Sequence, residues 1–495
     1  MFFRAARLAA VAMAMAALCA PARAQDAGGL RLGTPEDLLA AGAQSDLPTP
    51  APSPTPTGLK KKAATPGLPP LQAYPSAERL GLRGGPPAPD PTLVPAANVA
   101  APPPLTQRKA TPDDDPFAPL GIDLGDMRLT PYFEQDLGYS DNPGQHSQGG
   151  KGSGVSTTEV GAAFQSRWAR DDLHGQLRAG YNDFFTDRAA NAPYGSGDIS
   201  GRLDVTRDLS FDAQGRFSAS AETATSLGLS GVTIIGASAP LLTTEGATFG
   251  ATDKFGRFSL ALHGSIDRTG YQSATLSNGT IDDVASDNFS DTGVKLRGAY
   301  QASPEFSPFI EAATDARRYD HAIDANGYAR NSTGWSASFG ASVEVTRLIT
   351  GEVSAGYAHR RYSDARLAPV RGPIVSASLI WSPTPLTTVT LNATSGINDS
   401  TIAGASSAMT RTVALDIAHR LLRNFLLGAN AGYTTDKYNG VTQSDSTAIF
   451  GARAEYDIGR DIVLKATASR RLYKSSVPGS DYAADVFMLG LRVRR

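Results

Sequence analysis

Apolar and polar residues alternate one by one along most of the last three-quarters of this chain, in runs of about 12–17 residues. In the run 462–473, Ile462 and Leu464 fall on one face, whereas Lys465 and Thr467 fall on the other. A period of two is typical of a β-strand that has one apolar and one polar face. We find no comparably long run with the period of an α-helix, so the pattern predicts an all-β protein.

The connections between these runs alternate in length. Short turns lie near Asp208, Gly256 and Ser303, and longer polar connections such as 320–328 and 398–406 separate consecutive short turns. Antiparallel strands with short turns at one end and long loops at the other are typical of outer-membrane barrels. We therefore expect a transmembrane up-and-down antiparallel β-barrel of about 18 strands, with 16 or 20 as the alternatives. The expected strands start near residues 127, 154, 172, 197, 209, 244, 256, 286, 305, 331, 349, 371, 385, 407, 423, 445, 461 and 483.

The same alternation assigns charged residues to one face of each strand. An Arg or Lys facing lipid at the midplane of a membrane costs roughly 2–4 kcal/mol, so these charges should face the lumen. We expect weak ion selectivity, mildly cationic, and charge reversal at both Asp315 and Asp416 should shift it toward anions without loss of folding. The alternative is that the charges form salt bridges that close the lumen. The candidate pore-lining residues are Glu311, Asp315, Arg317, Asp416, Arg453, Glu455, Asp457, Lys465, Arg471 and Arg492.

The longest connection, Ser226 to Leu242, is unusually apolar for an outer loop. Loops normally keep polar residues at the surface, so apolar loop residues need a place to bury. The segment could fold into the lumen and narrow it, or it could form a contact between subunits, and the sequence does not separate the two. The candidate constriction residues are Leu229, Ile234, Ile235 and Leu241.

The beginning of the chain has a different character. Residues 1–24 have the positive start, short apolar stretch and small-residue cleavage site of a secretory signal peptide, which predicts cleavage between Ala24 and Gln25. Residues 25–120 contain most of the 33 prolines. Proline-rich runs favour a solvated extended chain over a packed core, so we expect a disordered periplasmic spacer. The barrel then occupies residues 121–495.

Composition excludes several classes of protein. The chain has 46 Lys and Arg against 48 Asp and Glu, so it lacks the basic excess that nucleic-acid binding requires. Its only cysteine, Cys19, lies in the signal peptide, which argues against disulfides and thiolate metal sites. The six histidines do not have metal-ligand spacing, and no nucleophile motif is present. We therefore expect no enzymatic activity, no metal and no cofactor.

Several short segments carry a resemblance to a known family. They are Asp113–Ile122 and Tyr139–Asn142 near the start of the barrel, and Arg317–Asp320, Gly327–Ser332 and Trp381–Thr387 in its middle. These segments are similar to the putative β-barrel porin 2 family, and the resemblance covers about residues 113–495. It implies an outer-membrane barrel, in some members linked to exopolysaccharide export, without catalytic residues. The chain ends in two arginines, where outer-membrane barrels commonly end in an aromatic residue.

Two functions from different classes remain open at this point. The first is a porin-like channel in the bacterial outer membrane for passive diffusion of small hydrophilic solutes. The second is a non-conducting or export-partner barrel that serves exopolysaccharide secretion or envelope attachment. Expected partners are outer-membrane lipid and the β-barrel assembly machinery, with peptidoglycan or polysaccharide-export proteins as candidates for the Pro-rich arm. The sequence names neither the solute nor the oligomeric state.

Overall fold

The computed structural model describes residues 116–495, except for residues 148, 188–189, 222–240, 276–280, 283–286, 325, 346–347, 399, 401 and 403. The expected signal peptide and the spacer up to residue 115 lie outside the described residues, as do Leu229, Ile234 and Ile235 of the expected constriction loop. In the described part of the chain, we find no helix that is long and apolar enough to cross a membrane.

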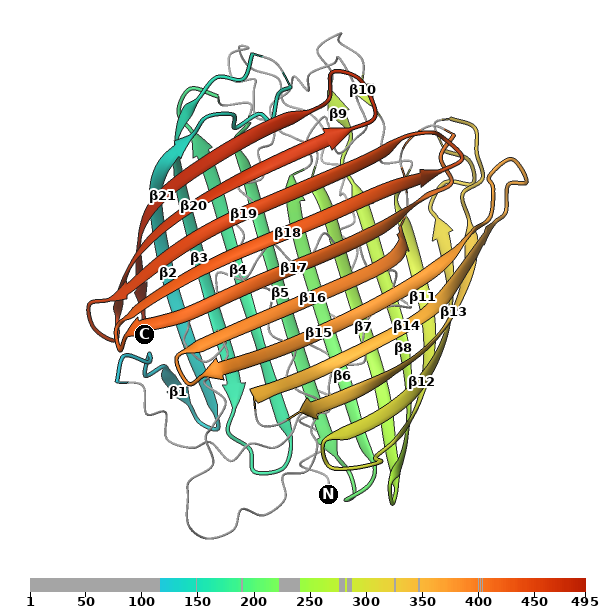
Figure 1. Cartoon of the computed structure of the whole chain (residues 1–495), viewed down its shortest axis with the longest axis horizontal. Coiled ribbons are helices and arrows are strands. Elements are labelled where there is room, and N and C mark those ends of the chain that lie inside the picture. Colours follow the sequence, from blue (N-terminus) through green and yellow to red (C-terminus); the bar gives the residue numbers. More distant parts are fainter. Residues whose placement is uncertain are drawn as a thin grey trace, which may run out of the picture. The chain divides into compact units, whose positions relative to one another are not determined.

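The described residues form a closed antiparallel β-barrel of 18 long strands, as the alternation predicts (Figure 1). Each strand pairs with its neighbours in the chain, so the topology is up-and-down. The strands are β2 (Met127–Ser140), β3 (Ser153–Ser166), β4 (Asp172–Phe184), β5 (Ala192–Asp204), β6 (Ser210–Ala221), β7 (Leu241–Phe255), β8 (Phe258–Tyr271), β11 (Phe289–Tyr300), β12 (Phe306–Tyr319), β13 (Ser332–Val345), β14 (Ile349–Tyr362), β15 (Val370–Thr384), β16 (Thr387–Asn398), β17 (Ser407–Leu422), β18 (Phe425–Asn439), β19 (Ser444–Asp457), β20 (Ile462–Ser475) and β21 (Tyr482–Arg494).

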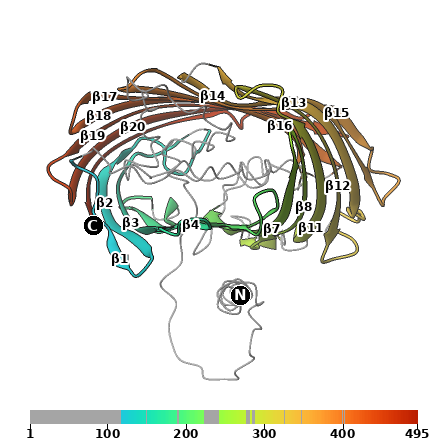
Figure 2. The same ribbon diagram turned by 90° about the horizontal axis from the view of Figure 1, so that it is seen from below.

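The last strand closes the ring by pairing with the first long one (Figure 2). The β21–β2 ladder runs from Arg494 opposite Tyr132 to Val486 opposite Ser140. Below it, the short strand β1 (Ile122–Leu124) folds back in a hairpin and pairs with Met127–Leu129. The edge of β2 that extends past the end of β21 is therefore covered by β1. Closure leaves the barrel wall without a free edge strand.

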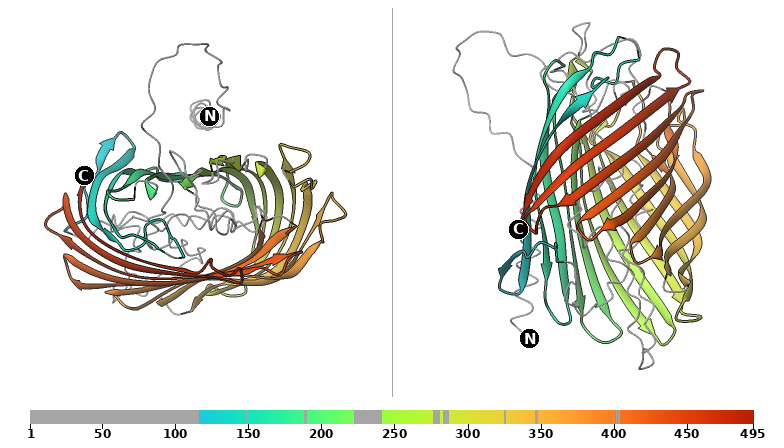
Figure 3. Two further views of the ribbon diagram at one scale, coloured as in Figure 1. Left: turned by 90° about the horizontal axis from the view of Figure 1, so that it is seen from above. Right: turned by 60° about the vertical axis from the view of Figure 1, so that its left-hand side comes forward.

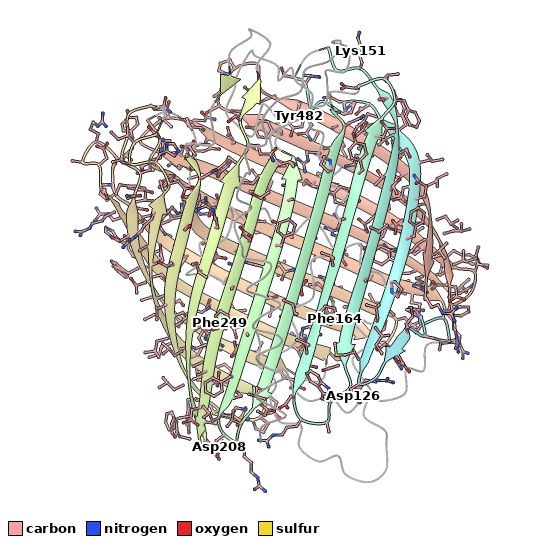
Figure 4. All side chains as sticks on the ribbon, turned by 180° about the vertical axis from the view of Figure 1, so that it is seen from behind. Asp126, Lys151, Phe164, Asp208, Phe249 and Tyr482 are labelled. Carbon is pink, nitrogen blue, oxygen red and sulfur yellow. The ribbon has the colours of Figure 1, made fainter. Side chains whose placement is uncertain are left out.

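The two ends of the barrel differ in the length of their connections. Asp126 and Asp208 lie at the end with the short turns, whereas Lys151 and Tyr482 lie at the opposite end, where the connections are long (Figure 4). We call the latter the outer end, because outer-membrane barrels have short periplasmic turns and longer extracellular loops.

Burial in the barrel is inverted relative to a soluble protein. Outward-facing Ile310 is 70% exposed, whereas inward-facing Arg492 is 1% exposed. Many large apolar side chains on the outward faces are likewise exposed, and many charged ones on the inward faces are buried. Figure 3 shows the strands end-on and from the side. An apolar exterior around a polar interior is the arrangement expected for a barrel that crosses a lipid bilayer.

Most expected strand positions agree with the structure, and the differences have local causes. β5 begins at Ala192 rather than near residue 197, because Ala192–Ser196 contains a proline and a glycine and shows no clear alternation of apolar and polar residues. Leu241, expected in the constriction loop, is instead the first residue of β7. The three-residue β1 and the two-residue strands β9 (Ala274–Thr275) and β10 (Ile281–Asp282) are too short to give a periodic signal.

Candidate functional site: the inner wall of the barrel

All ten candidate pore-lining residues lie on the inward faces of their strands. They come from β12, β17, β19, β20 and β21, and their outward neighbours along each strand are mostly exposed apolar or small residues. Asp315, Arg317, Asp416, Arg453, Glu455, Asp457 and Arg492 are buried, and Glu311, Lys465 and Arg471 are partly buried. The structure also shows what surrounds these charges, and most of them belong to ion-paired groups.

The first group bridges the seam between the first and last strands. Glu134 on β2 forms ion pairs with Arg492 on β21 and with Lys465 on β20. Glu159 on β3 accepts hydrogen bonds from two phenols, at 2.7 Å from the Tyr132 hydroxyl and 2.8 Å from the Tyr194 hydroxyl. These contacts join residues from both ends of the barrel sequence across its inner wall.

A second group occupies the inward faces of β11, β12 and β14. The Arg317 guanidinium contacts the Asp291 carboxylate at 3.1 Å. Arg360 pairs with Asp315 and approaches Asp291 at 4.0 Å. Two carboxylates thus face two guanidinium groups, and all four side chains are buried. The group is balanced in formal charge.

A third group lies nearer the short-turn end of the same strands. The Arg297 guanidinium forms a bidentate ion pair with the Glu352 carboxylate, with N–O distances of 2.9 and 2.5 Å. The same guanidinium lies 3.6 Å from the centre of the Phe309 ring and 3.8 Å from Glu311. Lys295 approaches Glu311 at 3.9 Å. Bidentate guanidinium–carboxylate pairs fix both the position and the orientation of the two side chains.

Two further pairs link strands β17, β19 and β21. Arg453 binds both carboxylate oxygens of Asp416, at 2.7 and 3.1 Å. Arg494 contacts Asp457 at 2.7 Å. Asp416 and Arg453 lie on β17 and β19, so the pair spans the intervening strand β18. Removing or reversing one member would leave the other buried without its counter-charge, which is unfavourable.

This pairing changes one expectation. Charge reversal at Asp315 and Asp416 was expected to alter ion selectivity without loss of folded protein. In the structure each carboxylate is buried against an arginine, Arg360 and Arg453 respectively, so reversal would bring two cations together. The strand alternation identifies the inward face, but it does not reveal which charges meet across strands.

Several inward charges were missed by the sequence reading, namely Glu134, Asp291, Arg297, Glu352 and Arg360. Each stands at an alternating position within a strand, so the same rule could have found it. Their roles depend on partners that are distant in the chain. Glu134 and Arg492, for example, are 358 positions apart in the chain.

One sector of the inner wall is neutral. β16 contains no charged residue, and the single charge of β15, Arg371, faces outward. Ser378 and Asn392 are opposite each other on the inward faces, with a 2.7 Å hydrogen bond from the hydroxyl to the amide oxygen. The neighbouring inward pair, Ser376 and Thr394, is exposed. Exposed hydroxyl groups on an inward face can hydrogen-bond to water or to a polar solute.

The outer loops above this sector are bound to one another. Arg330, in the β12–β13 loop, pairs with Asp324 at 2.5 Å and is buried. Its guanidinium also donates hydrogen bonds to the carbonyl oxygens of Ser400, at 2.8 Å, and Ala405, at 2.9 Å, in the β16–β17 loop. Asn439, at the end of β18, donates to the carbonyl oxygen of Ala368 in the β14–β15 loop at 3.2 Å. We refer to these connected loops as the outer loop block.

A second, exposed contact joins two loops of the same block. The Arg366 guanidinium and backbone amide donate hydrogen bonds to the Asp364 carboxylate, as does the backbone amide of Ala329. These donors hold the pKa of the Asp364 carboxyl well below its usual range. The carboxylate therefore stays charged in moderately acidic solution.

Among the residues that the structure describes, no group of three or more His, Cys, Asp or Glu side chains is arranged to hold a metal ion. The described inner wall thus offers paired charges and hydroxyl groups.

Comparison with known proteins was informative at the family level. The model of the family described as "Putative beta-barrel porin 2" matches residues 115–495. No curated protein matches the chain.

Among solved structures, the chain is similar to the FrpB iron transporter from Neisseria meningitidis, with 10% identity, a TM-score of 0.39, and coverage of 73% of this chain and 65% of that one. It is also similar to the copper transporter OprC, with 10% identity, a TM-score of 0.41, and coverage of 76% and 82%. OccK2 (OpdF) from Pseudomonas aeruginosa gives 12% identity, a TM-score of 0.39, and coverage of 74% and 97%. At these values none of the three carries an argument about the function of this chain.

Proposed function

This chain belongs to the putative β-barrel porin 2 family, and we propose that it forms an outer-membrane channel for the passive diffusion of small hydrophilic solutes. The observation that carries the proposal is the inverted burial of the barrel, with exposed apolar residues outside and charged and hydroxyl-bearing residues inside. Barrels of 16–18 strands are wide enough to leave an aqueous channel.

The inner wall favours small solutes with little net charge. Most of the inward arginines are held by carboxylates, as in the Arg453–Asp416 pair, and therefore present little unbalanced field to a passing ion. The neutral sector of β15 and β16 offers hydroxyl groups such as those of Ser376 and Thr394. Hydroxyl groups donate and accept hydrogen bonds, so they can replace water around an uncharged polar solute.

Planar-bilayer recording of the purified full chain tests the proposal. We expect stable open channels that conduct both ions of potassium chloride, and swelling of liposomes that contain the protein in solutions of small uncharged solutes. Protein heated until it unfolds is the control and should give neither signal. A folded, inserted barrel that is silent in both assays would contradict the proposal and favour the export-partner alternative.

The proposed placement in the outer membrane also concerns the first part of the chain. The signal-peptide features of residues 1–24 and the proline-rich character of residues 25–115 support export, with an arm on the periplasmic side. Peptidoglycan and polysaccharide-export proteins remain candidate partners of that arm. The folded barrel should fractionate with outer membranes and migrate faster in gels when it is not boiled.

A further inference from the structure

In the sector formed by strands β11–β20, the outward surface of the barrel carries Lys and Arg side chains only near the outer end. On strands β11–β20, every carboxylate faces inward, as the alternation and register of the strands require. The Lys and Arg residues on the outward faces all fall within the outermost six residues of their strands. They are Arg318, Arg361, Arg371, Arg411, Lys437, Arg470 and Lys474.

Most of these cations have no counter-charge in the described part of the chain. No carboxylate among the described residues pairs with Arg318, Arg361, Arg371, Arg411 or Lys437, and all five are exposed. This contrasts with the inward arginines, many of which are paired. Exposed cations without partners are available to an anion from outside the protein.

The cations lie close enough to share a ligand. Arg371 on β15 is directly opposite His359 on β14, and Arg361 is two residues further along β14 on the same face. Arg361 and Arg371 are therefore diagonal neighbours, about 7–8 Å apart between backbone positions. Like charges at this distance repel each other, and an anion between them would remove the repulsion.

Aromatic rings lie next to this pair, toward the apolar belt. Trp335 on β13 is opposite His359, with the two rings stacked at 6.0 Å and 29°. Tyr357 lies 6.5 Å from Trp335. Trp335 and Tyr357 are half exposed, and exposed Val353 and Phe339 continue the surface toward the middle of the barrel. Trp and Tyr are enriched at the boundary between the apolar core of a membrane and its head groups.

We propose that Arg361, Arg371, Trp335 and Tyr357 form a binding site for a lipid of the outer leaflet whose phosphorylated head group carries a net negative charge. The guanidinium groups match phosphate oxygens in charge and geometry. The apolar surface below them accommodates acyl chains, which a free phosphate ion lacks. Arg411 and Lys437, diagonal neighbours on β17 and β18, form a second pair of the same kind. The inference rests on the proposed placement in an outer membrane.

Native mass spectrometry of the full chain in detergent tests the site. The probes are diphosphorylated lipid A, phosphatidylcholine and inorganic phosphate. We expect lipid A to bind and phosphatidylcholine not to bind, and the variant R361Q/R371Q to bind lipid A at least roughly tenfold more weakly. The matched control R257Q/R423Q removes two exposed arginines from short turns at the other end and should bind as the parent does.

A further variant and a conductance measurement separate the possible outcomes. The variant R361K/R371K keeps both charges and should retain most of the binding, which distinguishes loss of charge from misfolding. Equal binding of lipid A by R361Q/R371Q and its parent would overturn the proposal, as would inorganic phosphate that binds as tightly as lipid A. Conductance of R361Q/R371Q should be unchanged. A silent barrel that still binds lipid A would reject the proposed diffusion and leave the lipid site standing.

Discussion

Arginine is used in three different ways in this barrel, and its position decides which. Arg453 faces inward and is held by both oxygens of Asp416. Arg330 is buried among loop carbonyl groups at the outer end. Arg361 faces outward without a carboxylate partner among the described residues. The planar guanidinium suits each role, because it can make several directional hydrogen bonds and keeps its charge at any accessible pH.

The inward pairs should contribute to the stability of the barrel. Replacing Asp416 with Asn leaves the buried Arg453 without its counter-charge, and breaking a buried pair in this way costs about 3 kcal/mol or more. We expect D416N to lower the free energy of unfolding by that amount in denaturant titrations of the barrel inserted into vesicles. The exchange D416R/R453D restores opposite charges and should recover part of the loss. No recovery would show that the pair itself is not the source of the stability.

The outer loop block should depend on Arg330 far more than on Arg366. Arg330→Gln leaves the buried Asp324 unpaired and removes hydrogen bonds to the β16–β17 loop, whereas Arg366→Gln breaks a pair at the surface. Exposed pairs contribute little to stability. Hydrogen exchange should therefore accelerate in both connected loops in R330Q and only near residue 366 in R366Q. Similar exchange in the two variants would contradict a central role for Arg330.

At the scale of elements, the seam between β2 and β21 is where the first and last long strands meet and close the barrel. Arg494 contacts Asp457 and donates to the carbonyl oxygen of Phe117 at 2.9 Å, while β1 covers the free edge of β2. Arg460 donates to the carbonyl oxygen of Pro116, also at 2.9 Å. The short segment that precedes the barrel is therefore fixed onto the short-turn end of the seam.

This arrangement predicts a boundary for tolerated deletions. Removing residues 26–112 should leave a barrel that still migrates as a folded species in unboiled gels. Extending the deletion through residue 125 removes β1 and the carbonyl oxygens of Phe117 and Pro116 that accept from Arg494 and Arg460, and exposes the backbone of Met127–Leu129. We expect this longer deletion to unfold at a lower temperature, measured by the loss of the fast-migrating band on heating. Equal behaviour of both deletions would mean that β1 does not stabilise the seam.

The strands could be predicted from the sequence because each carries its own signal. A period of two and a turn at each end are local properties, and they located strands such as β14 and β20 within one residue of their observed starts. The short β1 has too few residues to show a period. The ion pairs could not be predicted, because the Glu134–Arg492 contact depends on the closure of the whole ring. The alternation in the sequence identifies the outward cations. The register of the strands is needed to tell which of them are neighbours.

At the scale of the whole molecule, charge is distributed unevenly around the inner wall. The ion-paired groups described above include residues of β2, β11, β12, β14, β17 and β19–β21, whereas β15 and β16 have no inward charge. A solute in the lumen would therefore meet balanced charges on some strands and hydroxyl and amide groups on others. The field of paired charges falls off faster with distance than that of a single charge. A single charge added to the neutral sector should therefore have the largest effect on the electrostatic potential in the lumen.

This asymmetry leads to a prediction for ion selectivity. The parent channel should show a reversal potential near zero in a potassium chloride gradient. Ser376→Asp places a carboxylate at an exposed inward position on a strand without inward charges, opposite Ser354 on β14 and Thr394 on β16 rather than an arginine. We expect this variant to shift the reversal potential toward cations, whereas Ser376→Asn, its uncharged match in size, should not. An unchanged potential in a folded, conducting S376D would mean that ions do not pass along the neutral sector.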